Sequence, residues 1–208
     1  LLLTAFGVAM VFPAALDLAS GSANWSAFLI AGAVTSAAGG AVALASANAM
    51  RGSLDVRQAY ALTIGAWVTL SLFGALPFVF GAPGLDPIDA VFESVSGITT
   101  TGSTMIVGLD TAPPGMNLWR GMLNWIGGLG IAFVAMIFLP VMRVGGMQFF
   151  KAQGFETFGK SMPRAADIAR SLLNAYAGLT FICIGAYSAI GMTPLDAVVM
   201  GAASIATG

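Results

Sequence analysis

Five stretches of this chain contain no charged residue, and all of them are rich in apolar side chains. A helix needs about 20 mostly apolar residues to cross the hydrocarbon core of a bilayer, and it satisfies its backbone hydrogen bonds without help from lipid. Since 58% of the residues are apolar and only 8% are charged, the chain is predicted to be an all-α polytopic membrane protein. The five uncharged stretches are Leu1–Leu16, Leu18–Met50, Gln58–Leu85, Gly121–Met142 and Ser171–Leu195.

The first two stretches are predicted to form a leading transmembrane hairpin. Gly21, Ser22 and Asn24 favour a turn, so the second helix is expected from about Trp25 to Ala49. The chain begins inside an apolar run and stops directly after a motif. It is therefore expected to be a fragment of a longer polypeptide.

The positions of the charged residues provide a test of this arrangement of five spans. Five spans put the connections alternately on two sides, and seven of the eight basic residues then share one side, which is cytoplasmic by the positive-inside rule. These are Arg51, Arg57, Arg143, Lys151, Lys160, Arg164 and Arg170. The opposite side receives six of the nine acids: Asp17, Asp86, Asp89, Glu93, Asp110 and Asp196. The segment from Arg143 to Arg170 is predicted to be a basic cytoplasmic linker, which either fixes the topology or docks a partner.

A short helix is predicted on the outer side, between the third and fourth stretches. Asp86 suits the N-cap, Pro87 suits the first helical position, and Asp89 places a carboxylate near the positive end of the helix. The 12 residues of Pro87–Ile98 would extend about 18 Å, which is too short to cross a bilayer.

The residues after this helix are Thr99, Thr100, Thr101 and Gly102, and the chain must then return to the outer side. Irregular backbone at membrane depth is tolerated only where protein encloses it or where it lines a wet cavity. These residues therefore favour a re-entrant pore loop, in which an extended strand climbs back with its carbonyls facing a central axis. The negative end of the short helix would favour a cation there. The alternative is a surface helix with a turn rich in serine and threonine.

A repeat supports the pore loop. A shift of 107 positions aligns Pro87–Thr101 with Pro194–Gly208 without a gap, and six of the fifteen pairs are identical. Thr193, Pro194 and Asp196 repeat the chemistry of a helix start. The repeated unit is a span, a short helix, a filter-like strand and a span. Chance similarity between segments rich in alanine and glycine is the alternative.

The composition disfavours an enzyme, because the chain contains no histidine and no cluster of carboxylates within its spans. Rings of backbone carbonyls can replace the hydration shell of a monovalent cation, whereas a pore selective for divalent ions would be expected to carry acidic rings. A secondary transporter of another class could also contain repeats and broken helices. A multipass membrane enzyme is the third alternative.

Four segments carry a resemblance to a known family: "GALPFVF", "DAVFESVSGITTTGS", "LWRGMLNWIGGLGIAFVAMIFLP" and "GGMQFFKAQG". They resemble the Trk/Ktr/HKT superfamily of potassium transporters, most closely its Trk membrane subunits. The resemblance implies four span, pore-helix, span units around one pore, of which this chain would contain one and a half. It also implies that Thr99, Thr100, Thr101 and Gly102 form the first strand of a potassium filter, and that Thr207 and Gly208 begin the second.

The resemblance further implies how the chain is divided and what it meets. The expected parts are the leading hairpin at 1–50, the first unit at 51–145, the cytoplasmic linker at 146–165 and the start of the second unit at 166–208. The expected function is potassium uptake through a multi-pass protein of the cytoplasmic (inner) membrane of a bacterium or archaeon. A cytosolic nucleotide-binding regulatory subunit and a homodimer are expected partners. Potassium is expected as the transported ion, with no covalent cofactor and no nucleic acid.

Several single residues admit two interpretations. Arg120 either pairs with Glu93 and supports the filter from behind, or extends its side chain to the membrane interface. The glycines of Ile126–Gly130 either allow close helix packing or form a hinge. Trp119 and Trp125 are predicted to be interface anchors rather than ligand contacts.

Overall fold

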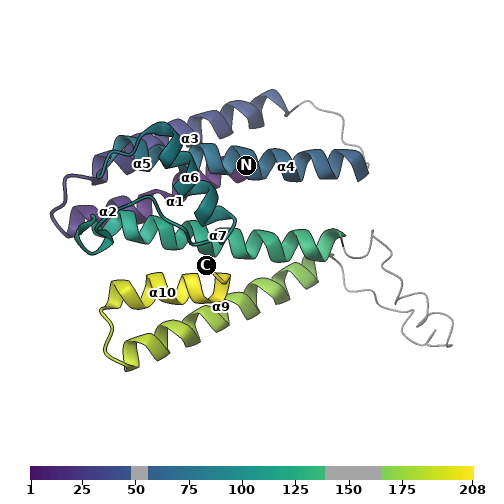
Figure 1. Cartoon of the computed structure of the whole chain (residues 1–208). Coiled ribbons are helices and arrows are strands. Elements are labelled where there is room, and N and C mark those ends of the chain that lie inside the picture. The colour runs from purple at the N-terminus through teal and green to yellow at the C-terminus, as the bar shows by residue number, and fades with distance from the viewer. Residues whose placement is uncertain (48–55, 139–164) are drawn as a thin grey trace, which may run out of the picture.

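The computed structural model describes residues 1–47, 56–138 and 165–208, and the regular elements of this part of the chain are all helical. The prediction of an all-α polytopic membrane protein is confirmed (Figure 1). Of the linker predicted at 146–165, all but Ala165 lies outside the described residues, and the last residues of the basic segment Arg143–Arg170 belong to helix α9 (Ala165–Ala189). The elements are α1 (Leu2–Ala9), α2 (Val11–Ala19), α3 (Trp25–Ala45), α4 (Val56–Gly74), α5 (Leu76–Phe80), α6 (Pro87–Ile98), the 3-10 turn η1 (Leu109–Thr111), α7 (Pro114–Phe138), α9 (Ala165–Ala189) and α10 (Pro194–Ala206).

Four segments of the described chain are long and apolar enough to cross a membrane: Leu2–Ala19, Trp25–Ala45, Tyr60–Phe80 and Ala169–Ala189. The remaining predicted span, Gly121–Met142, corresponds to the later part of α7, and its last residues lie outside the described ranges. The 25 residues of α7 extend about 37 Å, which exceeds the bilayer core.

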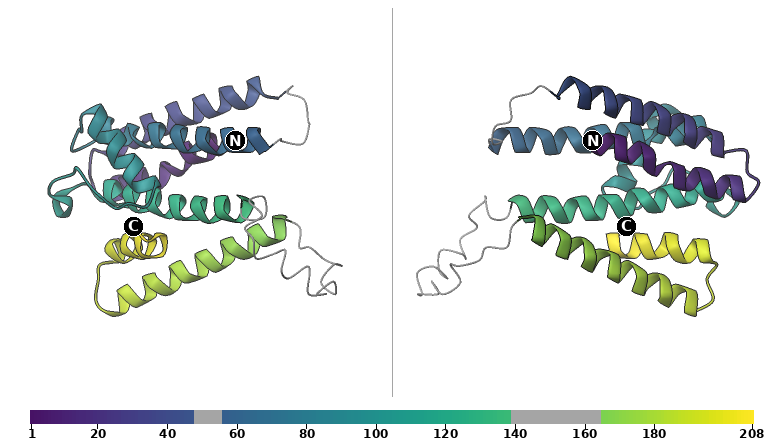
Figure 2. Two further views of the ribbon diagram at one scale, coloured as in Figure 1. Left: turned by 45° about the vertical axis from the view of Figure 1, so that its right-hand side comes forward. Right: turned by 180° about the vertical axis from the view of Figure 1, so that it is seen from behind.

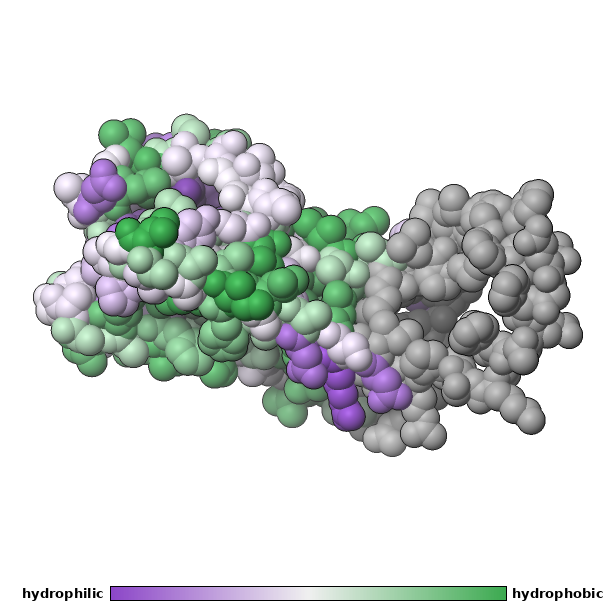
Figure 3. Space-filling model, turned by 90° about the horizontal axis from the view of Figure 1, so that it is seen from below, coloured by the Kyte–Doolittle hydropathy of each residue, from purple (hydrophilic) through white to green (hydrophobic). Residues whose placement is uncertain are grey.

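The long helices run side by side, and their ends agree with the predicted threading (Figures 1 and 2). The carboxyl ends of α3 and α7 and the amino ends of α4 and α9 all lie at one end of the molecule. The connections from α2 to α3 and from α9 to α10 lie at the opposite end. Hydrophobic residues cover much of the face in Figure 3, and Phe181 and Ile182 of α9 are 74% and 68% exposed. Apolar surface of this kind is typical of helices that face lipid or another membrane segment.

Trp119 of α7 lies at the centre of the core rather than at an interface. Its ring is fully buried, with centroids 5.2 Å from Phe6 and 6.4 Å from Phe28. Its indole N–H donates to the carbonyl of Gly74 at 3.0 Å, where the break between α4 and α5 leaves that carbonyl without a helical partner. The predicted anchor role of Trp119 is wrong, because packing and a freed backbone carbonyl hold the ring inside.

The helices α6 and α10, which begin the two copies of the sequence repeat, pack on opposite sides of α7 (Figure 1). The α6 helix contacts α4 and α7, and α10 contacts α7 and α9. A Cβ built on Gly127 would lie 2.0 Å from the carbonyl oxygen of Ile98, and one on Gly128 would lie 2.9 Å from the Cα of Ala206. Both distances are too short for a side chain. Gly127 and Gly128 therefore allow the close helix packing of the first interpretation, whereas a Cβ on Gly130 would make only ordinary contact with Trp67.

A buried carboxylate fastens the leading hairpin to the first unit. Asp17 is fully buried, and its carboxylate accepts hydrogen bonds from the backbone N–H of Gly115 at 2.6 Å and the side-chain amide of Asn24 at 2.9 Å. Gly115 is the second residue of α7, so Asp17 caps that helix from 98 positions away. Asn24 in turn accepts from the backbone N–H of Ala82 at 2.8 Å.

Candidate functional site

Both short helices begin where their capping residues predict. The α6 helix spans Pro87–Ile98, as predicted to the residue, and α10 spans Pro194–Ala206. Thr193 caps α10, accepting from the backbone N–H of Asp196 at 3.2 Å. Asp86 occupies the N-cap position of α6 but makes no side-chain capping hydrogen bond. Proline at the first position therefore starts both helices, with a side-chain cap on the second only.

The two helices also end in the same way. The N–H of Thr100 donates to the carbonyl of Gly97, and the N–H of Thr101 donates to the carbonyl of Ser96, both at 2.9 Å. This is a Schellman motif. The same pair of bonds recurs 107 positions later, from Thr207 to Ser204 at 3.3 Å and from Gly208 to Ala203 at 3.0 Å. The sequence repeat therefore coincides with a repeat of the local backbone structure at the two helix ends.

The motif places a threonine in the left-handed region at each helix end. Thr100 has a φ of 58° and Thr207 a φ of 64°, the only positive values of a non-glycine residue among the described residues. Thr99 keeps helix-like angles, with a φ of −84° and a ψ of 2°. The predicted extended strand is therefore wrong at Thr99 and Thr100, because the helix closes with a turn before the chain reverses. A β-branched residue in this region costs about 1–3 kcal/mol, and such strain gathers at functional sites.

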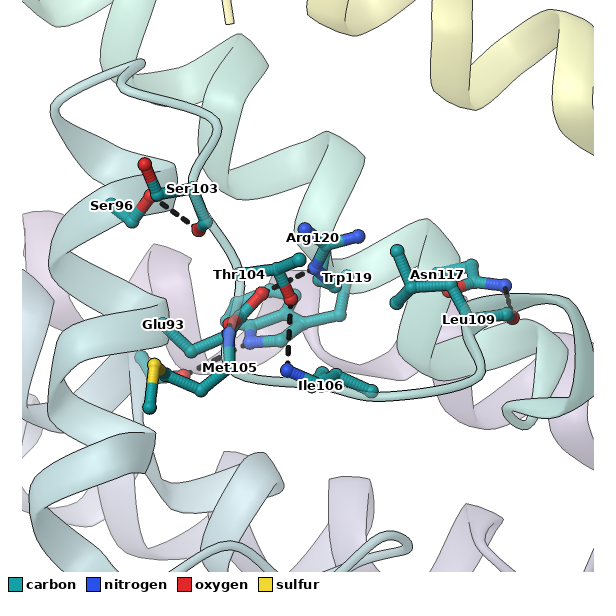
Figure 4. A network of polar contacts seen from close by, with 11 residues as sticks. Glu93, Ser96, Ser103, Thr104, Met105, Ile106, Leu109, Asn117, Trp119 and Arg120 are labelled. Atoms are coloured by element: carbon teal, nitrogen blue, oxygen red, sulfur yellow. Dashed lines mark hydrogen bonds and ion pairs between the residues drawn. The ribbon is translucent and has the colours of Figure 1, made fainter.

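The chain after Gly102 runs back along α6. The hydroxyl of Ser96 donates to the carbonyl of Ser103 at 2.6 Å, and the carboxylate of Glu93 accepts from the N–H of Met105 at 2.8 Å (Figure 4). The partners move toward the start of α6 as the chain moves forward, so the segment reverses its direction. This is the course expected of a re-entrant loop.

Arg120 lies behind this return segment and binds the same glutamate. Its Nε donates to Oε1 of Glu93 at 2.5 Å, and the side chain of Glu93 is only 1% exposed (Figure 4). The predicted contact between the two residues is present. One carboxylate thus joins α6, α7 and the return segment. A cavity of about 10 Å³ lies between these elements, lined by Glu93, Ser96, Gly97, Gly102, Ser103, Arg120 and Asn124.

The two repeats converge at their carboxyl ends. A Cβ built on Gly102 would lie 3.0 Å from the carbonyl carbon of Gly208, so the two return segments touch. Ile98 and Ala206, the last residues of α6 and α10, lie against Gly127 and Gly128, which are neighbours on α7. Each helix end carries a partial negative charge. Two such ends side by side make this point favourable for a cation.

All the residues predicted for the first and second strands lie in this region. Thr99, Thr101 and Gly102 are exposed, as are Thr207 and Gly208. The hydroxyl of Thr99 donates to the carbonyl of Val95 at 2.7 Å and lies 2.9 Å from the hydroxyl of Thr101. Sequence reasoning missed the contributions of Ser96 and Asn124. Ser96 lies three positions after Glu93 and so shares its helix face, and this spacing could have indicated its role. Asn124 contacts Gly208, which is 84 positions away in the sequence, and no local pattern indicates such a contact.

Comparison with known proteins places this geometry in a family. A model of the TrkH family, described as a cation transport protein, matches residues 25–202. The chain belongs to the TrkH family of cation transport proteins.

Relatives of this TrkH-family chain are potassium uptake proteins by name. It is 47% identical over 156 residues to Trk system potassium uptake protein TrkI of Halomonas elongata, covering 75% of this chain and 32% of that protein. It is 38% identical over 211 residues to TrkH of the same organism, covering all of this chain and 44% of that protein. It is 42% identical over 161 residues to TrkH of Escherichia coli K12, covering 76% of this chain and 33% of that protein.

The fold agrees with a solved relative. The crystal structure of the potassium transporter TrkH from Vibrio parahaemolyticus superposes with a TM-score of 0.83 at 33% identity, over 97% of this chain and 40% of that one. The chain therefore spans between 32% and 44% of the length of these relatives.

Proposed function

We propose that the protein containing this chain takes up potassium across the cytoplasmic (inner) membrane of a bacterium or archaeon through a channel-like pore. In this proposal the chain supplies the leading hairpin, a first unit and the start of a second, with boundaries near 1–50, 51–145, 146–165 and 166–208. The observation that carries the proposal is the convergence of two strained helix ends at Gly102 and Gly208. The names of the relatives supply the ion.

The proposed filter uses backbone carbonyls of Thr99, Thr100, Thr101 and Gly102 from the first unit, and of Thr207 and Gly208 from the second. Carbonyl dipoles arranged in rings replace the hydration shell of a monovalent cation, and their number and field strength set selectivity. The negative ends of α6 and α10 add to the attraction. A membrane potential that is negative inside contributes about 2.3 kcal/mol per charge per 100 mV and so drives uptake.

Glu93 and Arg120 are proposed to support the first strand. The carboxylate accepts from the N–H of Met105 while the guanidinium fixes its orientation. The pair touches the return segment behind the filter, so it acts on the geometry of the filter without binding the ion. The wider assembly is proposed to include a cytosolic nucleotide-binding regulatory subunit and a second copy of the membrane protein.

Rubidium flux into vesicles that carry the intact protein tests the proposal. The wild-type protein is expected to conduct rubidium down its gradient without a co-substrate. Gly102→Ala is expected to reduce the flux by about tenfold or more, because the φ of 75° and the contact with Gly208 both oppose a side chain.

Gly21→Ala is the matched control, because Gly21 has a φ of 74° but nothing within 4 Å of an added Cβ. It should retain wild-type flux. A flux that requires sodium or a proton gradient would instead favour a secondary transporter of another class. Equal flux in the two alanine variants would place the ion path away from Gly102.

A further inference from the structure

The two repeats differ in how their return strands are held. In the first repeat, Glu93 and Ser96 of α6 bind the backbone of the return segment. The residues 107 positions later are Met200 and Ala203. A thioether and a methyl group cannot donate to a carbonyl or accept strongly from an amide. The helix of the second repeat therefore lacks the two polar side chains that bind the return segment in the first repeat.

Asn124 of α7 occupies the place from which such support can come. It lies one helical turn after Arg120, on the same face of α7. A Cβ built on Gly208 would lie 2.9 Å from both Cγ and Oδ1 of Asn124, so its amide rests directly against the backbone of Gly208. Asn124 is one of the buried polar residues of the described chain, with only 9% of its surface exposed.

The amide oxygen of Asn124 is also uncommitted. It is buried and has no hydrogen-bond partner within the described ranges. Buried polar atoms are nearly always hydrogen-bonded, so an acceptor at this point indicates a donor in the adjoining structure. The small cavity between α6 and α7 reaches both Asn124 and Gly102, which joins the amide to the first strand as well.

We propose that Asn124 is the positioning residue of the second filter strand and holds the backbone at Gly208. This inference rests on the proposed function and deepens it. Arg120 supports the first strand through Glu93, and Asn124 supports the second directly, so a single face of α7 sets the two strands against each other. Because Gly102 touches Gly208, a shift of either strand changes the spacing of the carbonyls that select the ion.

The selectivity of the intact protein in vesicles tests the inference. Asn124→Ala is expected to lower the ratio of rubidium to sodium flux by about tenfold, or about 1.4 kcal/mol, because the backbone of Gly208 loses the side chain that packs against it. Asn117→Ala is the matched control. Asn117 lies on the same helix and also has an amide oxygen without a partner in the described chain, but its amide nitrogen donates to Leu109 at 2.9 Å, in the outer loop. Asn117→Ala should keep the wild-type ratio.

A double-mutant cycle shows whether Asn124 acts through Gly208. Gly208→Ala should impair selectivity, and its effect should shrink in the Asn124→Ala background, because the added Cβ then has room. Additive effects would overturn the inference, as would a wild-type ratio in Asn124→Ala. Asn124→Ser also removes the contact between the amide and Gly208, and it replaces Asn124→Ala in the test if the alanine variant does not accumulate. Failure of both variants to accumulate would assign Asn124 to the fold and overturn the inference, whereas absence of flux in the wild type would contradict the proposed function itself.

Discussion

Two threonines carry the strain of the site at the level of single residues. Thr100 and Thr207 adopt a conformation that glycine adopts freely, and they do so at equivalent positions of the repeat. A glycine there would lower the cost of the turn and also loosen it, whereas a β-branched side chain has few rotamers and keeps the turn stiff. The presence of this strain in both repeats is consistent with a backbone whose carbonyl groups must keep a fixed spacing.

The pair of Glu93 and Arg120 yields a prediction about single side chains. Arg120→Gln should destabilise the intact protein by about 3 kcal/mol, because it leaves the buried carboxylate of Glu93 without its charged partner. It should also lower the selectivity for rubidium over sodium, since Glu93 holds the N–H of Met105. Thermal unfolding in detergent and flux in vesicles measure the two effects.

Arg170→Gln provides the control for Arg120→Gln, because Arg170 is an exposed arginine near the start of α9. Its stability should change by less than about 0.5 kcal/mol. If Arg120→Gln behaved like Arg170→Gln in both measurements, the supporting role of the pair would be refuted, and Arg120 would be no more than a surface arginine.

At the level of elements, α7 is the helix on which both short helices rest. Gly127→Ala should displace the end of α6, because the new Cβ would fall 2.0 Å from the carbonyl oxygen of Ile98. Overpacking of this kind costs about 1–3 kcal/mol. Gly130→Ala, three residues later, would place its Cβ 3.5 Å from Trp67, which is ordinary contact. Since alanine favours a helix by about 1 kcal/mol over glycine, this control should be neutral or stabilising.

Rubidium flux and thermal unfolding of the two alanine variants decide between packing and hinge. Loss of flux and stability in Gly127→Ala alone supports packing. A loss of flux in both variants, with stability unchanged in both, would instead indicate that the glycines act as a hinge.

The sequence predicted those elements that local chemistry determines. The start of α6 followed from Pro87 and the acidic residues beside it, which act within the first helical turn, and its end from the threonines and glycine that follow it. The left-handed turn at Thr100 could not be predicted, because threonine does not favour it and the surroundings impose it. The burial of Trp119 and the contact of Asn124 with Gly208 depend on helices that meet only after folding.

At the level of the whole molecule, the leading hairpin is attached to the first unit at the end where α2 connects to α3. Asp17 binds the start of α7, and Asn24 links Asp17 to the loop before α6 through Ala82. The phenyl rings of Phe6 and Phe28, on the two arms of the hairpin, pack on Trp119 deeper in the same contact. The hairpin therefore holds the amino-terminal half of α7, from which Arg120 and Asn124 reach the region of the proposed filter.

Asp17→Ala should weaken this attachment by about 2–4 kcal/mol, because it leaves the buried N–H of Gly115 and the half-buried amide of Asn24 without their acceptor. Asp86→Ala is a matched control, since Asp86 is an exposed carboxylate at a helix start that makes no side-chain capping bond. Thermal unfolding of the intact protein compares the two variants. Equal and small losses would mean that aromatic packing alone holds the hairpin. A large loss in Asp17→Ala together with reduced selectivity would show that an attachment 98 positions apart in sequence is transmitted along α7 to the filter.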